Sequence, residues 1–344
     1  MLRILNVAYP FAPVGPDAVG GAEQILFALD QALVAAGHHS TVMACEGSQV
    51  SGNLLPIATS CGDIDPAARN QVYTTVRQLL RTAAMRADLV HLHGIDFPAY
   101  LPPEGPPALV TLHLPVSWYP KDALHPTRQD TWFNCVSRSQ ERTCPADVNL
   151  VSSIPNGVPV EALSRVRHAR RDYALMLGRI CPEKGQHLAL QAAHRANARL
   201  LLAGEVFPYA EHRAYFANDV RPMLDQHRRY LGPIGFARKR RLLSAARCLL
   251  IPSLCPETSS LVAMEAMACG TPVIAFGSGA LPDTVENGRT GFIVENVDDM
   301  VAALHEVVAI DRERCRHTAV ARFSQDRMTD AYLELYERLV TCTR

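Results

Sequence analysis

Two glutamates eight residues apart, Glu257 and Glu265, have the side chains in this sequence best spaced to act together on one ligand. The apolar run Cys248–Ile251 leads towards the first, and the second lies within Leu261–Ala268, which is predicted to be a helix. Eight helical residues span roughly 12 Å, so the carboxylates could bind hydroxyl groups at opposite ends of a ligand. Amides near Ser259 would lie between them at a helix N-terminus, where negative charge is favoured. The alternative is that Glu257 only complements the helix dipole and Glu265 is a surface residue.

A guanidinium and an ammonium group follow another apolar run. Arg179 and Lys184 lie five residues apart in the loop that continues Tyr173–Leu177. Both groups suit the recognition of a diphosphate, the first by its planar fork and the second as a point charge. A charged, solvated surface loop explains the same residues equally well.

Gly20 and Gly21 precede a predicted helix directly. Two glycines at a strand-to-helix turn let backbone N–H groups approach an anion at the helix N-terminus. The pair does not form a G-x-G-x-x-G pattern, so a simple turn explains it as well as a phosphate site does.

Histidines and one acidic pair complete the set of side chains with possible chemistry. His113 ends the apolar run Ala108–His113, a position where a lone histidine is usually structural. His91 and His93 flank Leu92, and we assign them to packing or acceptor contact rather than to a metal. Asp63-Ile64-Asp65 matches the metal-binding pattern Asp-x-Asp, but no buried strand leads into it, so we predict a loop with an aspartate capping a helix.

Short apolar runs alternate with helix-period segments along the whole chain, which is typical of parallel βαβ units. Their continuous apolarity predicts strands buried on both faces. In the first half we predict strands at Arg3–Ala8, Ser40–Ala44, Asp88–His93, Ala108–His113, Thr131–Ser137 and Asp147–Val151, and helices at Ala22–Ala36 and Gln71–Met85.

The alternation is interrupted by a charged, apolar-poor segment, Glu161–Asp172, which we predict to be a linker. It then resumes with strands at Tyr173–Leu177, Arg199–Ala203, Tyr230–Leu231, Cys248–Pro252 and Thr271–Phe276, helices from Gln186 and over Lys239–Ala246 and Leu261–Ala268, and a helical tail from Val297. We therefore expect two Rossmann-like domains, 1–160 and 172–324, with a C-terminal helix at about 325–344 packing back on the first. In open parallel sheets ligands bind beyond the carboxyl ends of the strands.

The charge balance and the cysteine pattern argue against several classes of protein. The 344 residues include 34 Lys and Arg against 34 Asp and Glu, a balance that gives no field favouring nucleic acid. The local basic run Arg238–Arg241 is predicted to be a solvated helix face. Ten scattered cysteines without a Cys-x-x-Cys pattern predict reduced thiols rather than disulfides or zinc. No apolar stretch is long enough to span a membrane, and the N-terminus is predicted to be a buried strand rather than a signal peptide.

Taken together, these segments resemble the retaining GT-B glycosyltransferases of family 4, whose signature is Glu-x7-Glu followed by Ala-x-Ala-x-Gly-x-Pro-Val. After Glu257 and Glu265 the chain has the matching residues Ala266, Ala268, Gly270, Pro272 and Val273. The likeness extends to Gly20-Gly21, Ile154–Val158, Gly178-Arg179, Glu183-Lys184-Gly185 and Gly277–Gly291, in the expected order. The chain departs from the family at Thr258-Ser259-Ser260, where members often have Gly-Phe-Gly, and this leaves the identity of the donor sugar open.

The resemblance implies a role for each matched residue. Arg179 and Lys184 would hold the donor diphosphate, assisted by backbone amides at Gly20 and Gly21. The donor site would also include Ser259, Ser260 and Leu261. Glu265 would bind the ribose hydroxyls, Glu257 the hydroxyls of the transferred sugar, and His113 would face that sugar. Acceptor contacts are expected from Pro115–Asp122, with Trp118 and Tyr119.

The same resemblance implies the GT-B fold, two doubly wound domains facing across a cleft, and a cytoplasmic enzyme of carbohydrate or antibiotic biosynthesis. It would move a sugar, with retention, from a nucleoside-diphosphate sugar (UDP or GDP) to a hydroxyl of a glycan, lipid or natural product. It would need no metal or cofactor, and peripheral contact with the inner membrane face stays open. The rival functions are a nucleotide-sugar epimerase, a glycan phosphorylase with pyridoxal phosphate, and a non-catalytic nucleotide-sugar binding protein.

Overall fold

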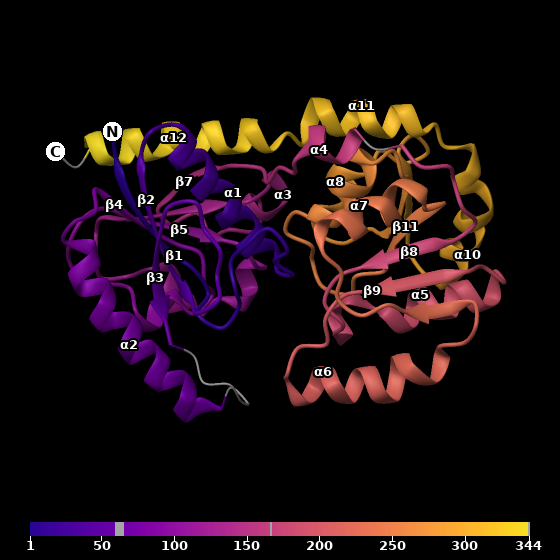
Figure 1. Ribbon diagram of the computed structural model, residues 1–344, viewed down its shortest axis with the longest axis horizontal. Coiled ribbons are helices and arrows are strands. Elements are labelled where there is room, and N and C mark those ends of the chain that lie inside the picture. The colour runs from indigo at the N-terminus through magenta and orange to yellow at the C-terminus, as the bar shows by residue number, and fades with distance from the viewer. Residues whose placement is uncertain (59–64, 166, 343–344) are drawn as a thin grey trace. The chain divides into compact units, whose positions relative to one another are not determined.

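The computed structural model describes residues 1–58, 65–165 and 167–342. The chain forms two compact units, which we call the first unit (Met1–Asn156 with Asp326–Arg344) and the second unit (Gly157–Gln325) (Figure 1). The chain therefore leaves the first unit after Asn156 and returns to it at Asp326. The charged segment that begins at Glu161 belongs to the second unit.

The first unit is built on a seven-stranded parallel sheet with the order β3-β2-β1-β4-β5-β6-β7. The order reverses at β1, which makes the sheet doubly wound. Every residue of β4 and β5 is buried, as expected for parallel strands covered on both faces. The strands are β1 (Arg3–Val7), β2 (His39–Cys45), β3 (Asn53–Ile57), β4 (Leu89–Leu92), β5 (Ala108–Leu112), β6 (Thr131–Cys135) and β7 (Leu150–Ser153); the helices are α1 (Gly21–Ala35), α2 (Pro66–Ala84), α3 (Arg138–Glu141) and α12 (Gln325–Cys342).

The last helix of the chain completes this first unit (Figure 1, yellow). Tyr332 and Tyr336 of α12 are fully buried. The Tyr336 hydroxyl lies 2.7 Å from His91 Nδ1 at the end of β4, and the Tyr332 hydroxyl accepts a 3.0 Å hydrogen bond from Asn134 Nδ2 on β6. Residues 326–342 thus supply polar partners to the middle of a sheet made by the first half of the chain.

The second unit repeats the architecture with a six-stranded parallel sheet, in the order β10-β9-β8-β11-β12-β13. Its strands are β8 (Ala174–Leu177), β9 (Leu200–Ala203), β10 (Arg228–Tyr230), β11 (Cys248–Ile251), β12 (Val273–Phe276) and β13 (Gly291–Val294). Its helices are α4 (Val160–Ser164), α5 (Gln186–Arg195), α6 (Ala210–Tyr215), α7 (Phe236–Ala245), α8 (Leu261–Ala268), α9 (Leu281–Thr284), α10 (Val297–Glu306) and α11 (Arg312–Arg322).

The predicted fold class, an α/β protein with two doubly wound parallel sheets, is confirmed. Two edge strands were not predicted. β3 contains Pro56 and is only partly buried, a composition tolerated at a sheet edge, and β13 is four residues long. β7 begins at Leu150, three residues after the predicted start at Asp147.

Asp65 bears out the expected helix cap, because its Oδ1 accepts a 2.7 Å hydrogen bond from the Ala68 amide at the start of α2. Asp63 and Ile64, the other residues of the Asp-x-Asp pattern, lie outside the described residues.

The predicted helical tail is confirmed as α10, α11 and α12. Among the described residues, no helix combines the length and the apolarity needed to cross a membrane.

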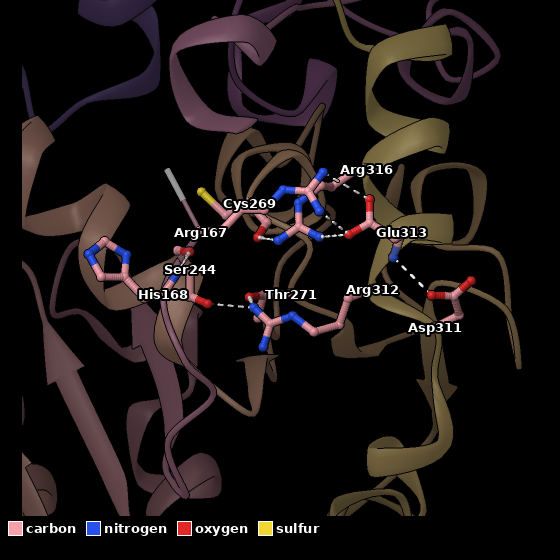
Figure 2. A network of polar contacts seen from close by, with 9 residues as sticks. All are labelled: Arg167, His168, Ser244, Cys269, Thr271, Asp311, Arg312, Glu313 and Arg316. Carbon is pink, nitrogen blue, oxygen red and sulfur yellow. Dashed lines mark hydrogen bonds and ion pairs between the residues drawn. The ribbon is translucent and has the colours of Figure 1, made fainter. Parts of the chain in front are cut away.

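A polar network fastens α11 to the turn after α8 (Figure 2). Arg316 donates to the Cys269 carbonyl at 3.0 Å and forms a 2.5 Å ion pair with Glu313, which also pairs with Arg167 at 2.9 Å. Arg312 donates to Thr271 Oγ1 at 3.1 Å. The turn between α8 and β12 is therefore fixed by side chains from α11, and with it the end of the helix that carries Glu265.

Candidate functional site

A partly buried ion pair joins two segments that the sequence analysis treated separately. Lys184, in the turn after β8, lies 2.6 Å from Glu257 Oε1, in the loop after β11. Ser253 donates to the same carboxylate oxygen at 2.5 Å. Burial raises the pKa of Glu257, but the charge and hydrogen bond of Lys184 outweigh it and lower this pKa overall. Burial likewise lowers the pKa of Lys184, and Glu257 more than reverses this effect, so both groups are held in their charged forms.

Arg179 begins the same turn, directly after Gly178. Gly178 has a φ of 144°, a conformation that favours glycine, and it lets the chain turn sharply at the end of β8. The Arg179 guanidinium carbon lies 5.6 Å from the centre of the Phe207 ring, and its carbonyl accepts a 2.8 Å hydrogen bond from Gln186 Nε2. The turn thus brings two cationic side chains to the carboxyl ends of β8 and β11.

The start of α8 carries polar groups that lack partners within the protein. Ser260 has left-handed backbone angles (φ 53°, ψ 68°), and Leu261 begins the helix. The hydroxyls of Ser259 and Ser260 are buried and have no hydrogen-bond partner. Buried polar groups are nearly always satisfied, so such a pair at a helix N-terminus is suited to a polar ligand.

Glu265 lies one turn further along α8 and is 2% exposed. The reading of this residue as a surface glutamate is therefore wrong. Its Oε1 lies 2.5 Å from Lys239 Nζ, whereas its Oε2 is buried without a partner. The carboxylate is held at one oxygen and open to a ligand at the other.

Lys239 is the functional candidate that sequence reasoning missed. The run Arg238–Arg241 was predicted to be a solvated helix face, and this is correct for its exposed first and last residues but wrong for Lys239. Lys239 lies four residues before the buried Leu243 on α7, so both are on one face of the helix. That spacing was the signal available in the sequence.

A cluster of possible metal ligands lies beside Arg179. Ligand atoms of Cys181, Glu183 and His212 lie within 4.8 Å of one another, and this is the one group of three or more such residues found in the described chain. Burial lowers the pKa of His212 and the charge of Arg179 lowers it further, while burial raises the pKa of Cys181 to about 12. A cation here would face the guanidinium of Arg179, so we interpret the cluster as polar support for that side chain.

In the first unit the structure brings together three histidines at the ends of β4 and β5. His93 Nδ1 lies 3.0 Å from His113 Nε2 with the rings stacked, and His91 Nε2 lies 2.6 Å from Thr111 Oγ1. Burial lowers the pKa of all three, that of His113 to about 3. They are therefore neutral at pH 7. His93 Nε2 is buried without a partner, which leaves a ring nitrogen available to a ligand.

Gly20 and Gly21 stand at the N-terminus of α1 with ordinary backbone angles at the capping residue Gly20. A Cβ added at Gly20 would overlap the carboxylate of Glu23 in the first turn. That carboxylate is the far end of a flexible side chain, so neither this contact nor the backbone conformation requires glycine at position 20. In the predicted acceptor loop, Tyr119 is buried and Trp118 is 39% exposed, so Trp118 is the one of the two that can contact a partner.

Two family models match consecutive parts of the chain. Residues 19–162 match the model described as Glycosyltransferase Family 4, and residues 171–309 match Glycosyl transferases group 1. A D-inositol 3-phosphate glycosyltransferase from Mycolicibacterium paratuberculosis is 32% identical over 185 residues, 49% of this chain and 41% of the relative. One from Mycobacterium bovis BCG is 33% identical over 178 residues, 48% of this chain and 36% of that protein. The matched segments thus span about two fifths of these relatives.

Solved structures share the fold over nearly the whole chain. Sucrose-phosphate synthase from Thermosynechococcus elongatus has a TM-score of 0.83 at 22% identity, covering 99% of this chain and 100% of that one. The Anabaena protein HepE, solved with UDP-glucose, has a TM-score of 0.76 at 18% identity, covering 98% and 100%. A glycosyltransferase of avilamycin A biosynthesis has a TM-score of 0.71 at 23% identity, covering 99% and 98%.

Proposed function

We propose, from the premise that this chain belongs to the group 1, family 4 glycosyltransferases, that it transfers a sugar from a nucleoside-diphosphate sugar to an acceptor hydroxyl, with retention and without a metal. The observation that carries the proposal is the row of groups at the start of α8. Glu257, which pairs with Lys184, the partnerless hydroxyls of Ser259 and Ser260, and the open oxygen of Glu265 follow one another along the 9 residues 257–265 after β11.

Each group then has a role that its chemistry suits. Arg179, Lys184 and the amides at Ser260 and Leu261 bind the diphosphate. Glu265 accepts a hydrogen bond from a ribose hydroxyl. Glu257, kept ionised by Lys184, binds hydroxyls of the transferred sugar and stabilises positive charge at its anomeric carbon. From the first unit we propose that His113, held neutral and stacked on His93, contacts the transferred sugar, and that the amides of Gly20 and Gly21 contact the phosphates.

In the reaction the bond between the anomeric carbon and the diphosphate oxygen breaks, and its electron pair stays on that oxygen. The acceptor oxygen bonds to the anomeric carbon, and its proton leaves with the diphosphate. Fixed positive charge from Arg179 and Lys184 stabilises the departing group, a contribution of about 10² to 10³ in rate for one such contact. These two cations give the charge stabilisation that a metal ion gives elsewhere, which supports a metal-independent reaction.

The donor nucleotide is proposed to be UDP or GDP, with UDP as the first probe, because a protein of the same fold was solved with UDP-glucose. The acceptor is proposed to be a hydroxyl of a glycan, lipid or natural product. An epimerase and a binding protein share the nucleotide site but differ in turnover: the first isomerises the donor without an acceptor, and the second leaves it unchanged.

Calorimetric titration without divalent metal, using UDP, GDP, dTDP and ADP, tests the nucleotide site. We expect one of these nucleotides to bind at micromolar concentration, and Glu265→Ala to weaken it tenfold or more, whereas Glu211→Ala on the exposed surface of α6 leaves it unchanged. Turnover of the matching sugar donor should fall about 10² to 10³-fold in Lys184→Met. Failure of all four nucleotides to bind wild-type protein would falsify the proposal.

A further inference from the structure

We propose that Asp96 and Arg69 of the first unit bind a neutral, hydroxylated ring, a sugar or a cyclitol, as the acceptor of the transfer. The inference rests on the proposed function, and it adds the chemical class of the acceptor and two residues that recognise it. It starts from two atoms that the protein leaves unsatisfied. Asp96 Oδ2 and Arg69 Nε are both buried, and neither has a hydrogen-bond partner.

Asp96 lies where the order of the first sheet reverses, between the neighbouring strands β1 and β4. It follows the end of β4 by four residues, and Tyr9 follows the end of β1 by two. In doubly wound sheets, ligands bind beyond the carboxyl ends of the strands at such a point. Asp96 also comes three residues after His93, which stacks on His113. An acceptor bound by Asp96 would therefore lie at the same edge of the sheet as the histidine proposed to contact the transferred sugar.

A structural role does not explain the Asp96 carboxylate. Asp96 stands directly before the short helix Phe97–Ala99, where an aspartate usually caps helix amides, but its side chain makes no capping hydrogen bond. Its Oδ1 accepts a 2.7 Å hydrogen bond from the Tyr100 hydroxyl, whereas Oδ2 accepts none. A buried acceptor left without a donor costs about 1–3 kcal/mol. A ligand hydroxyl would supply that donor.

Helix α2 supplies the other half of the site. Burial raises the pKa of Asp96, and a hydrogen bond from Tyr100 offsets this only in part. A hydrogen bond from Tyr73 and the charge of Arg69, one turn apart on α2, lower the same pKa further, so this helix reaches the carboxylate.

Aromatic rings surround these polar groups. The centre of the Tyr73 ring lies 5.9 Å from that of Tyr100 and 6.2 Å from that of Phe11, and Phe11 lies 5.5 Å from Tyr9. Tyr9, Phe11 and Tyr73 are each half-buried. The site therefore combines a few placed polar atoms with aromatic surface, as sites for small organic ligands usually do.

The charges of Asp96 and Arg69 decide which ligand fits. A phosphate or carboxylate group is repelled by Asp96, and a metal ion is repelled by Arg69. An alkyl chain would leave both orphaned atoms without partners. A ring with several hydroxyls satisfies both, because one hydroxyl donates to Asp96 Oδ2 and another accepts from Arg69 Nε. The C–H groups of such a ring can pack on the aromatic side chains.

The experiment measures ring binding to the full chain by saturation-transfer NMR. The probes are the methyl glycosides of glucose, galactose and mannose, and myo-inositol. We expect at least one to bind wild-type protein, Asp96→Asn to weaken it about tenfold or more, and Arg69→Met to weaken it at least about threefold. The octyl derivative of the ring that binds, used below its micelle concentration, distinguishes the sources. Tighter binding than that of the probe assigns the ring to a glycolipid, and equal binding assigns it to a free sugar or a glycan.

Matched controls are Asp130→Asn, at an exposed position before β6 on the opposite edge of the sheet, and Arg81→Met, on the exposed face of α2. Both should bind the ring as wild type does. Melting temperatures and nucleotide calorimetry of every variant report whether it is folded. In turnover, Asp96→Asn should raise the KM of the ring that binds and leave hydrolysis of the donor without acceptor unchanged.

The outcomes separate this inference from the proposed function. If wild type binds no nucleotide, the proposed function fails, and the acceptor role of Asp96 fails with it. If nucleotides bind but none of the rings does, or if a ring binds equally well to Asp96→Asn, only this inference is refuted. Displacement of the ring by inorganic phosphate would refute the chemical class assigned to the acceptor.

Discussion

At the scale of residues, the candidate side chains of each unit have charge states that are set by burial and by their neighbours. Lys184 and Glu257 fix each other as ions, whereas His91, His93 and His113 are kept neutral because burial lowers the pKa of each. Neutral rings can accept or donate hydrogen bonds without adding charge. The ionised pair of the second unit and the neutral histidines of the first unit therefore offer different chemistry to a ligand.

The lowered pKa of the histidines predicts a stability that falls in weak acid. Below pH 6.5 the unfolded chain binds protons on these residues and the folded chain does not, so the free energy of unfolding decreases as the pH drops through that value. Each such histidine contributes up to about 1.4 kcal/mol per pH unit. Urea unfolding of His93→Gln should show a smaller decrease between pH 7.5 and pH 5.5 than wild type. His317→Gln, on the exposed side of α11, should match wild type, and equal slopes in all three proteins would contradict the prediction.

The sequence indicated most of these residues but not their pairings. Glu257 and Lys184 are 73 positions apart, and no local sequence pattern predicts that the loops after β8 and β11 are in contact. That meeting follows from sheet order, because β8 and β11 are neighbours. Lys239 was missed for a different reason: in a run of four basic residues the helix period, and not the composition, decides which side chain turns inward.

At the scale of elements, α8 is the part of the fold that places the site. Its N-terminal end carries Ser260 in a left-handed conformation, and its C-terminal turn is tied to α11 through Arg316 and Cys269 (Figure 2). Gly270 makes this turn with a φ of 76° and lies against the Arg316 guanidinium. The C-terminal end of this eight-residue helix is therefore fixed by contacts outside it, while its N-terminal hydroxyls have no partner within the protein.

Replacement of Gly270 tests that anchoring. Alanine at a left-handed position costs about 1–2 kcal/mol by itself, and a Cβ at Gly270 would also overlap Arg316 and displace it from the Cys269 carbonyl. Gly288→Ala is the matched control, because its φ is 74° and an added Cβ meets nothing within 4 Å. Gly270→Ala should lower the melting temperature further than Gly288→Ala, by about 2–4 °C per additional kcal/mol, and should weaken nucleotide binding. A smaller effect than that of the control would show that α11 does not hold the turn.

Element types were predictable where apolar runs were long and continuous, as in β1, β5 and β11. They were not predictable at sheet edges. β3 is half exposed and contains a proline, so its sequence lacks the pattern of a strand buried on both faces. Only the presence of β2 beside it, in register from Thr41 and Asn53 to Cys45 and Ile57, makes it a strand.

At the scale of the whole molecule, the residues with proposed roles are distributed over two units of the same architecture. The side chains proposed to bind the nucleotide part of the donor lie in the second unit, and the three histidines lie in the first. The first unit is assembled from two ends of the chain, with Tyr336 of α12 bonded to His91 of β4. Stability of one unit and ligand binding by the other should therefore respond to different substitutions.

Tyr336→Phe tests this division. Loss of the hydroxyl leaves His91 Nδ1 buried without its 2.7 Å partner, which should lower the free energy of unfolding by about 1–3 kcal/mol. Nucleotide affinity should stay within twofold of wild type, about 0.4 kcal/mol, because the side chains proposed to bind it belong to the second unit and Tyr336 contacts none of the first-unit glycines proposed to assist them. Loss of affinity in Tyr336→Phe comparable to that in Glu265→Ala would contradict the division.

The return of the chain to its first unit at Asp326 also determines when that unit can be finished during translation. The ribosome releases β1 to β7 first. Tyr332 and Tyr336, which are hydrogen-bonded to β6 and β4 of that sheet, emerge only after all of Gly157–Gln325. Folding on the ribosome usually proceeds from the N-terminus. Here the second unit can complete its core before the ribosome has released α12, the last helix of the first unit. The first unit, most of which is made first, is therefore expected to reach its native state last.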